Sequence, residues 1–208
     1  MKHLKFLIFG IAVIWSCSEK TNSETRLLLE KVFEIGRVEG DSIYFSTTSL
    51  VDWLDVAEID SCSEEEFAVL EDIYHRRIGN EINLSDIFHK KDFEKICYEG
   101  RHNYEFDSDL IPKNFIPKDQ QYFDSLYFIY KNELSIANSD PSGLRILKMR
   151  ELYYRLSKPI FLHDYRYAVI GYSYQSFLKD YGGCSIFVFE KKENEWKLIF
   201  TSQICPFT

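Results

Sequence analysis

Residues 157–205, which decide the fold, read SKPIFLHDYRYAVIGYSYQSFLKDYGGCSIFVFEKKENEWKLIFTSQIC. Aromatic and β-branched residues fill most of this stretch, and polar or glycine-containing breaks interrupt it. Strands are predicted at Lys158–Leu162, Arg166–Tyr174, Cys184–Lys191 and Glu195–Gln203. Because each break can join neighbouring strands, the pattern predicts a four-stranded antiparallel meander.

The last two predicted strands can be aligned from the turn at Glu193-Asn194. Centring the hairpin on this turn pairs Phe187 with Phe200 and Phe189 with Leu198. This register gathers the aromatic side chains on one face, whereas a slip by one residue would scatter them over both faces. We therefore expect a hairpin with one apolar face.

The cysteines are spaced so that two disulfides are conceivable. Cys184 lies opposite Gln203 in this register, and Cys205 lies diagonally across on the same face. A Cys184–Cys205 disulfide is predicted, with two buried thiols as the alternative. Cys62 and Cys97 would then form the second pair and join two helical segments. An exported protein can keep such bonds.

The segment before the sheet carries mainly helical periodicity. Helices are predicted at Thr25–Ile35, Ser49–Ile59, Glu64–Ile78, Asp86–Tyr98 and Asp119–Leu134. Ser63 with Glu66 gives the third of these helices a capping box, and Ser85 is the expected cap of the fourth. Ser42–Thr47 favours a short strand, whereas Leu144–Leu156 suits either a helix or an extra strand.

In one long stretch the apolar residues follow neither helical nor strand periodicity. Arg101–Lys118 contains two prolines and several acidic residues, so it is interpreted as a long surface connection. A single domain is expected over residues 25–208. Its fold class is α+β, in which N-terminal helices of residues 25–156 pack on a C-terminal four-stranded antiparallel sheet of residues 157–205.

The start of the chain has the layout of an export signal. Lys2 and Lys5 precede the apolar run Phe6–Trp15, and the small residue Ser16 precedes Cys17. A charged, an apolar and a small-residue region in this order are typical of a secretory signal peptide. The apolar run is too short to cross a hydrocarbon core of about 30 Å as a helix. We expect residues 1–16 to be removed and residues 17–24 to form a tether.

Ile14-Trp15-Ser16-Cys17 resembles the lipobox of bacterial lipoprotein precursors, and an ordinary secretory signal is the alternative. The resemblance implies cleavage before Cys17 and acylation of its thiol and amine with fatty acyl chains such as palmitate. Several chains, at about 0.8 kcal/mol per buried CH₂, make such an attachment stable. Ser18 stands where an aspartate would imply retention in the inner membrane, so the resemblance implies the outer membrane of a bacterial cell envelope.

The C-terminal stretch also resembles the ends of many small, uncharacterised exported lipoproteins. The resemblance is carried by Ser157–Phe161, Tyr167–Ile170 and Glu195–Ile199 with the glycine pair between them. It implies a sheet and no particular activity.

Composition excludes some classes of function. The formal net charge of −8 argues against nucleic acid as a partner. With 45% hydrophobic and 16% aromatic residues, the chain is expected to be globular. The sequence holds no phosphate-binding glycine loop, no dinucleotide fingerprint and no metal-ligand spacing, so we expect no cofactor and no metal.

Three patterns resemble parts of catalytic sites, and each has a plainer explanation. Ser173 stands in half of a nucleophile elbow, yet it lies inside a predicted strand and not at a strand-to-helix turn. His163 and Asp164 are adjacent, and adjacent residues seldom form a base and its orienting acid, so a solvated turn explains them. Cys97 and His102 do not have zinc-ligand spacing. These patterns predict no catalytic residue.

Tyrosines gather around the second predicted strand and the loop that follows it. They are Tyr165, Tyr167, Tyr172, Tyr174 and Tyr181. Tyrosine offers a large contact area with a hydrogen-bonding tip at low entropic cost, which suits interfaces. We therefore predict a binding surface at Tyr174, Phe177 and Tyr181, although tyrosines populate any half-exposed sheet.

The expected function is that of a lipid-anchored envelope protein that binds another protein or a ligand without catalysis. An immunity or inhibitor protein against an envelope-acting toxin or hydrolase is one alternative, since an acidic body suits a basic partner. A second alternative is a hydrolase whose site is assembled only in the fold. Its candidate residues are His75, His89, His102 and His163.

Overall fold

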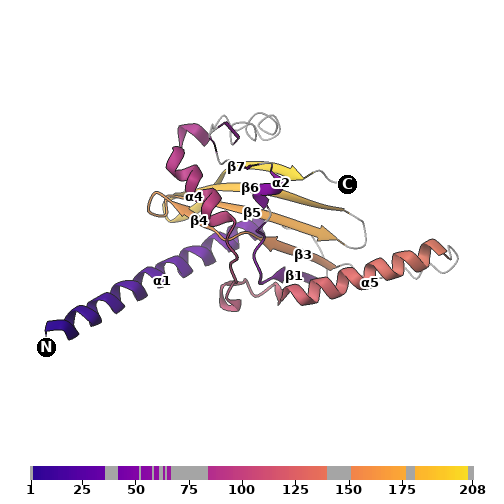
Figure 1. Cartoon of the computed structure of the whole chain (residues 1–208), viewed down its shortest axis with the longest axis horizontal. Helices are drawn as coiled ribbons and strands as arrows, with labels where there is room; N and C mark the ends of the chain where they lie inside the picture. The colour runs from indigo at the N-terminus through magenta and orange to yellow at the C-terminus, as the bar shows by residue number, and fades with distance from the viewer. Residues whose placement is uncertain are drawn as a thin grey trace.

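A computed structural model describes residues 2–35, 42–51, 53–57, 59–60, 63, 65–66, 84–139, 151–176 and 181–205. A seven-stranded mixed sheet forms the centre of the molecule. Helices lie along this sheet, and α1 and α5 extend beyond it in opposite directions (Figure 1). The predicted α+β class is confirmed, whereas the predicted four-stranded sheet is too small.

The strands are β1 (Ser42–Ser46), β2 (Ile116–Lys118), β3 (Glu151–Leu156), β4 (Ile160–Leu162), β5 (Tyr167–Ser176), β6 (Tyr181–Lys192) and β7 (Glu195–Cys205). Strands β4 to β7 form the predicted antiparallel meander. Strand β3 pairs antiparallel with β5 and parallel with β1, which pairs parallel with β2. The strand order is therefore β2-β1-β3-β5-β6-β7, and of the two possibilities for residues 144–156 the strand holds for residues 151–156.

The helices are α1 (Lys2–Ile35), α2 (Trp53–Val56), α4 (Lys90–Gly100), α5 (Gln120–Ser139) and the 3₁₀ turns η2 (Leu84–Asp86) and η3 (Ser108–Leu110). The predicted helix at 64–78 lies largely outside the described residues, but its capping box is present. Glu66 donates its backbone N–H to Ser63 Oγ, and Ser63 donates its own to the Glu66 carboxylate, both at 3.3 Å.

Two predicted helix starts are wrong. Helix α4 is capped by His89, whose backbone N–H donates to Asp92 at 2.9 Å, while Ser85 lies in the preceding 3₁₀ turn. Helix α1 begins well before Thr25 and includes residues 17–24, the expected tether. Tertiary contacts of Lys20 and Glu24, described below, hold this part of α1 against the sheet.

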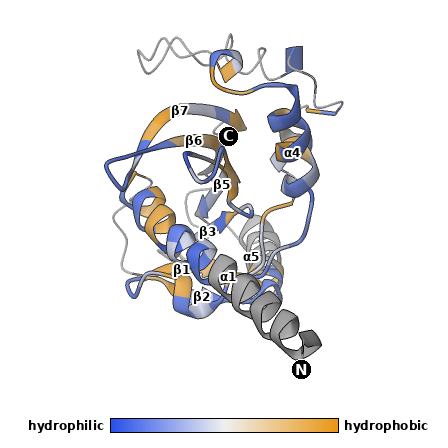
Figure 2. Ribbon diagram, turned by 90° about the vertical axis from the view of Figure 1, so that its left-hand side faces the viewer, coloured by the Kyte–Doolittle hydropathy of each residue, from blue (hydrophilic) through white to orange (hydrophobic). Residues whose placement is uncertain are grey.

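The sheet has a hydrophobic core on each face. On one face Val169, Ile186 and Val188 belong to a cluster with α2 and α4. On the other face Ile170 and Phe189 belong to a cluster with α1 and the connection around η3. Figure 2 shows α1 and α4 on opposite sides of the strands. The architecture is thus three-layered, with the sheet in the middle.

The stretch from residue 101 to residue 118, predicted as a surface connection, is part of the core on the α1 face. Phe106, Leu110, Ile111 and Phe115 are all buried. The Phe115 ring centre lies 3.8 Å from that of Phe33 on α1. The prediction failed because these residues cross the sheet as turns and loop, so their burial follows no helical or strand period.

The register of the last hairpin is as predicted only next to its turn. Between Val188 and Phe189 the pairing shifts by one residue, which places Phe200 opposite Val188 and not opposite Phe187. The shift leaves Ile199 as an extra residue, a β-bulge that turns Phe200 toward the α4 face. The single apolar face expected for this hairpin is therefore divided between the two cores.

A second shift, between Cys184 and Ser185, sets the geometry of the predicted disulfide. It brings Cys184 directly opposite Cys205 in place of Gln203, with 5.2 Å between the two Cα atoms. The Cys184–Cys205 disulfide is thereby confirmed, although the diagonal arrangement was wrong. Cys97 is also disulfide-bonded, and Cys62, its predicted partner, lies outside the described residues.

Trp53 fills the centre of the core on the α4 face. Its side chain is buried, and its indole N–H donates to the Gly100 carbonyl at 3.1 Å. A Cβ atom added to Gly171 on β5 would lie 2.7 Å from Trp53 Cγ, and one added to Gly100 would lie 2.8 Å from Trp53 Cζ2. The indole therefore packs directly on the backbone of both α4 and β5.

Candidate functional site

The tyrosines expected to form a surface mostly serve the two cores. Tyr167 and Tyr172 are 7% and 4% exposed and belong to opposite faces of the sheet. Burial raises the pKa of Tyr172, and the neighbouring Tyr154 adds to this shift. Tyr174 is half-buried, with its ring centre 5.9 Å from that of Tyr172. Phe177 and the side chain of Tyr181 lie outside the described residues.

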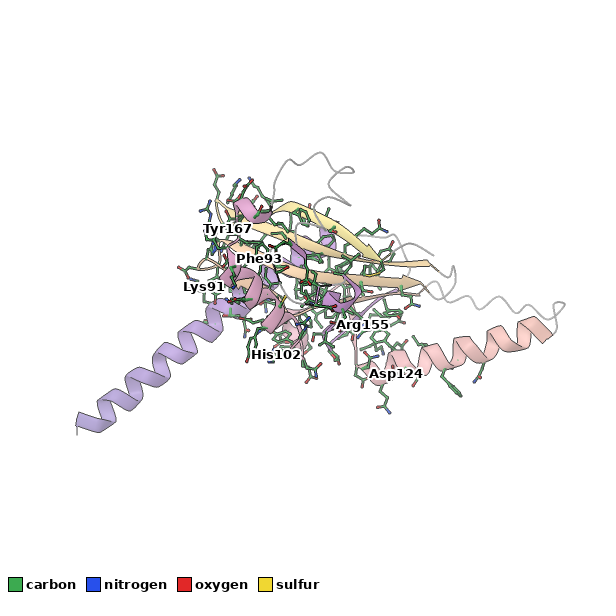
Figure 3. All side chains as sticks on the ribbon, turned by 45° about the horizontal axis from the view of Figure 1, so that its top comes forward. Lys91, Phe93, His102, Asp124, Arg155 and Tyr167 are labelled. Carbon is green, nitrogen blue, oxygen red and sulfur yellow. A yellow bond between two sulfur atoms is a disulfide. The ribbon has the colours of Figure 1, made fainter. Side chains whose placement is uncertain are left out.

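Of the histidines considered for a hydrolase, His89 and His163 both lie near Asp92, whereas His102 lies apart from them. His163 Nε2 lies 3.0 Å from Asp92 Oδ2, beside the N-terminus of α4. His102 lies beyond the other end of the same helix, where its Nδ1 contacts the Tyr98 carbonyl at 2.5 Å (Figure 3). His75 is outside the described residues. Ser173 lies mid-strand in β5, opposite Arg155 and Cys184.

Metal binding has no support among the residues that the structure describes, where no three His, Cys, Asp or Glu side chains form a candidate group. Cys97, moreover, is in a disulfide and has no thiolate to offer.

The Asp92 carboxylate accepts hydrogen bonds from the His163 side chain and from the His89 backbone N–H at the start of α4. Burial by itself raises the pKa of Asp92. Hydrogen bonds from the His89 backbone and the His163 side chain, together with the electrostatic effect of both histidines, outweigh burial and hold the pKa of Asp92 below its usual value. The group therefore joins the β4–β5 turn to α4.

We expect the Asp92→Asn variant to be less stable than the wild type at pH 7 by about 1 kcal/mol, the usual value of such a hydrogen bond. Because the folded pKa is lower than the unfolded one, the stabilisation is present above the unfolded pKa and is lost as the pH falls through the folded pKa. Urea unfolding should show a difference that shrinks between pH 7 and about pH 3. The control Glu94→Gln, on the exposed side of α4, should show no comparable change with pH.

A hollow of about 330 Å³ lies where α1 crosses two hairpin turns. The turns join β4 to β5 and β6 to β7. The lining residues are Lys20 and Glu24 of α1, Asp164, Tyr165 and Arg166 of the first turn, and Lys191, Glu193 and Asn194 at the second. We call residues 19–24, 163–166 and 190–195 together the turn pole. Its hollow combines three cationic and three carboxylate side chains.

Helix α1 is tied to the first turn through its exposed side. Lys20 Nζ lies 3.3 Å from Asp164 Oδ1 and 4.4 Å from the centre of the Tyr165 ring. Thr21 Oγ1 and the Tyr165 hydroxyl form a hydrogen bond of 2.6 Å. Ion pairing, a cation–π contact and a hydrogen bond thus act on two consecutive residues of one turn.

Helix α1 is tied to the second turn by a largely buried ion pair. Lys191 Nζ lies 2.5 Å from Glu24 Oε1, and the two side chains are 18% and 10% exposed. Lys191 Nζ also lies 5.7 Å from the centre of the Trp196 ring. On the far side of the turn Glu190 accepts from Lys192 at 2.7 Å and from Arg166 at 3.3 Å. Both contacts lower the pKa of Glu190, and the contact with Lys192 has the larger effect.

The backbone of the turn pole is unusual. In the described part of the chain, every non-glycine residue with positive φ lies in its two turns. They are His163 (50°), Asp164 (53°), Tyr165 (66°), Glu193 (53°) and Asn194 (67°). The last two match the type I′ hairpin turn. Each of the three consecutive left-handed residues costs about 1–2 kcal/mol of conformational free energy. The contacts of this turn with α1 and α4 offset that cost. Strained backbone of this kind is enriched at functional sites.

The turn pole is therefore the candidate site, and sequence analysis identified its turns only as connections. No local signal could have joined them to α1, because Lys20 and Asp164 are 144 residues apart in the chain.

In the part of the chain that the structure describes, no helix has the length and hydrophobicity needed to cross a bilayer. No protein-family description matches the chain, and neither a curated protein nor a solved structure does.

Proposed function

We propose that the mature protein is acylated at Cys17, is anchored in a bacterial cell envelope, and acts there as a binding module without catalysis.

 The proposal includes the outer membrane as the site of the anchor and another protein or a ligand as the partner, as predicted from the sequence. The position of Cys17 supports the anchor. The contacts that tie α1 to the hairpin turns come from Lys20, Thr21 and Glu24. All three follow Cys17, so cleavage before Cys17 leaves them intact.

The arrangement of the polar side chains supports binding over catalysis. His163 and Asp92 join a turn to a helix, and Ser173 pairs within the sheet. A hydrolase needs a nucleophile and a base within hydrogen-bond reach of each other, and these three residues serve the fold instead.

A binding surface at the end of β5 suits a protein that is anchored at Cys17. Strand β5 runs from the turn pole to Ser176, and its ten residues span about 30 Å. Figure 3 shows Tyr167, the first residue of β5, toward the end of the sheet from which α1 extends, and Arg155 farther along. We propose that Tyr174 and the connection after it form the binding surface, because this end points away from the anchor.

The anchor is tested with a Cys17→Ser variant. We expect the wild-type chain to stay with the membrane fraction and the variant to enter the soluble fraction, with a change in partition of about tenfold or more, because several acyl chains are lost. Mass spectrometry of the wild type should find an N-terminal Cys17 that carries acyl groups. The control Ser18→Ala should partition as the wild type does.

A wild-type chain that is soluble, or that begins at another residue, would contradict the anchor. Binding is tested on the same membranes, solubilised in detergent, by affinity capture with the wild type and with a Tyr174→Ala variant. A partner recovered equally by both would contradict the proposed binding surface.

A further inference from the structure

We infer that the turn pole lies on phospholipid headgroups, so that the domain is docked against the membrane and does not move freely on a tether. The inference rests on the acylation of Cys17 in the proposed function. It adds the surface that meets the lipid and the orientation of the domain.

The first argument is the length of chain between the acylated residue and the turn pole. Lys20 already contacts Asp164 at 3.3 Å, so only Ser18 and Glu19 lie between Cys17 and the docked part of α1. Three residues rise about 4.5 Å in a helix and reach at most about 11 Å when fully extended. The first hairpin turn is therefore held within a short distance of the lipid.

The second argument is that α1 cannot easily be peeled away to lengthen this connection. A free tether from Cys17 to Glu24 could extend to about 25 Å, which would let the domain rotate. Glu24 is buried, and its pair with Lys191 joins α1 to the second hairpin turn. Thr21 adds the hydrogen bond to Tyr165. Both turns are therefore coupled to the anchor.

The third argument is the chemistry of the exposed surface. Asp164, Arg166, Lys192 and Lys20 have side-chain exposures of 89%, 63%, 56% and 51%. Charges of both signs are thus exposed where the turns meet the solvent, and each of them also takes part in an ion pair within the turn pole. A zwitterionic headgroup such as phosphatidylethanolamine carries a phosphate for the cations and an ammonium for the carboxylates. The net charge of −8 argues against adhesion to a purely anionic surface.

The hollow between α1 and the turns gives such a headgroup a place to bind. Its volume is about 330 Å³, comparable to small-molecule sites, which begin at about 300 Å³. Lys20 and Arg166 line it together with Asp164 and Glu193. The half-buried Tyr165 places an aromatic ring with a polar tip at the same level, a position that tyrosine favours at membrane interfaces.

The test measures lysine accessibility in the full acylated protein. The protein is placed on vesicles of phosphatidylethanolamine and phosphatidylglycerol and treated with a water-soluble acetylating reagent, and mass spectrometry gives the rate at each lysine. We expect Lys20 and Lys192 to react about fivefold or more slowly than in the Cys17→Ser protein, because the headgroup layer shields them. Lys113 should react at the same rate in both.

Lys113 is a suitable internal control because it is exposed and lies in the connection that packs near the C-terminal end of α1, the end farther from the anchor. It is close in sequence to Phe115, which packs on Phe33. Helical rise places Phe33 about 24 Å beyond Cys17.

A second control lengthens the connection and leaves the domain unchanged. Ten Gly and Ser residues inserted between Ser18 and Glu19 have a root-mean-square length of about 17 Å. This variant should stay on the vesicles while Lys20 and Lys192 recover the rates of the soluble protein.

Each outcome decides the inference. Slower reaction of Lys20 and Lys192, reversed by the insertion, supports it. Equal rates at all three lysines overturn it and leave the anchor intact. Slower reaction of Lys113 in place of Lys192 puts another face on the lipid and also overturns it. A wild-type chain that does not float with the vesicles removes the proposed anchor, and the inference falls with it.

Discussion

Replacing Trp53 with alanine is expected to lower the free energy of unfolding by about 3–5 kcal/mol, the usual effect of deleting a buried large aromatic side chain. Trp53 is 1% exposed, and it packs between α4 and β5. The variant loses this packing and leaves the Gly100 carbonyl without the indole N–H that donates to it at 3.1 Å. Urea unfolding monitored by circular dichroism measures the change.

The control for this variant is Phe128→Ala. Phe128 on α5 is 65% exposed, so its removal should change the free energy of unfolding by no more than about 0.5 kcal/mol. Equal destabilisation by the two substitutions would contradict the central position of Trp53 in the core.

A double-mutant cycle with Gly171 shows whether the indole lies directly on β5. Gly171→Ala alone should destabilise the protein by about 1–3 kcal/mol through overpacking, because the new Cβ would meet Trp53 Cγ at 2.7 Å. In the Trp53→Ala background the same substitution should have little effect, since the atom that it meets is gone. Strictly additive effects would show that the two residues are not in contact.

The sequence predicted the parts of the fold that depend on neighbouring residues. The β4–β7 meander and α5 were identified from local patterns, because hairpins and helices place residues that are close in sequence into contact. Strand β1 was also predicted, at Ser42–Thr47, but its pairing partners are distant in the sequence. Tyr44 on β1 pairs with Ile116 and with Tyr153, and β2 has three residues of which one is a proline. Such a strand has too little pattern to be recognised.

The register of β7 could not be read from alternation because the chain contains a bulge. An extra residue reverses the faces of every residue that follows it, so Trp196 and Phe200 point into different cores although they are separated by an even number of positions. Because both faces of the sheet are covered, either register of β7 places apolar side chains in a hydrophobic core. Alternation was therefore a weak guide to this strand.

The candidate site was even less accessible from the sequence. Glu193 and Asn194 were recognised as a turn, and the left-handed conformation of both is typical of a short hairpin. The ion pair that gives this turn its role joins Lys191 to Glu24, 167 residues away. Glu24 was assigned to a tether because its own neighbourhood is polar. Only the folded sheet brings the two turns under α1.

The Cys184–Cys205 disulfide supplies the second large expected effect. A cross-link with a sequence separation of 21 residues should contribute about 3 kcal/mol by restricting the unfolded chain. A Cys184→Ala, Cys205→Ala double variant should lose this amount in urea unfolding. Its dependence on urea should also be steeper, because the unfolded chain without the link exposes more surface.

Reductant separates this bond from the disulfide of Cys97. Reduced wild type loses both bonds, whereas the double variant under oxidising conditions loses only Cys184–Cys205, so the oxidised variant should be more stable than the reduced wild type. The bond lies beyond the second register shift of β7, where ladder pairing is already interrupted. Without the link this end of the hairpin should open first, and amide exchange should rise at Ser202–Ile204 before it rises near Trp196. Uniform exchange along β7, or an unchanged unfolding midpoint, would mean that packing alone holds the strand.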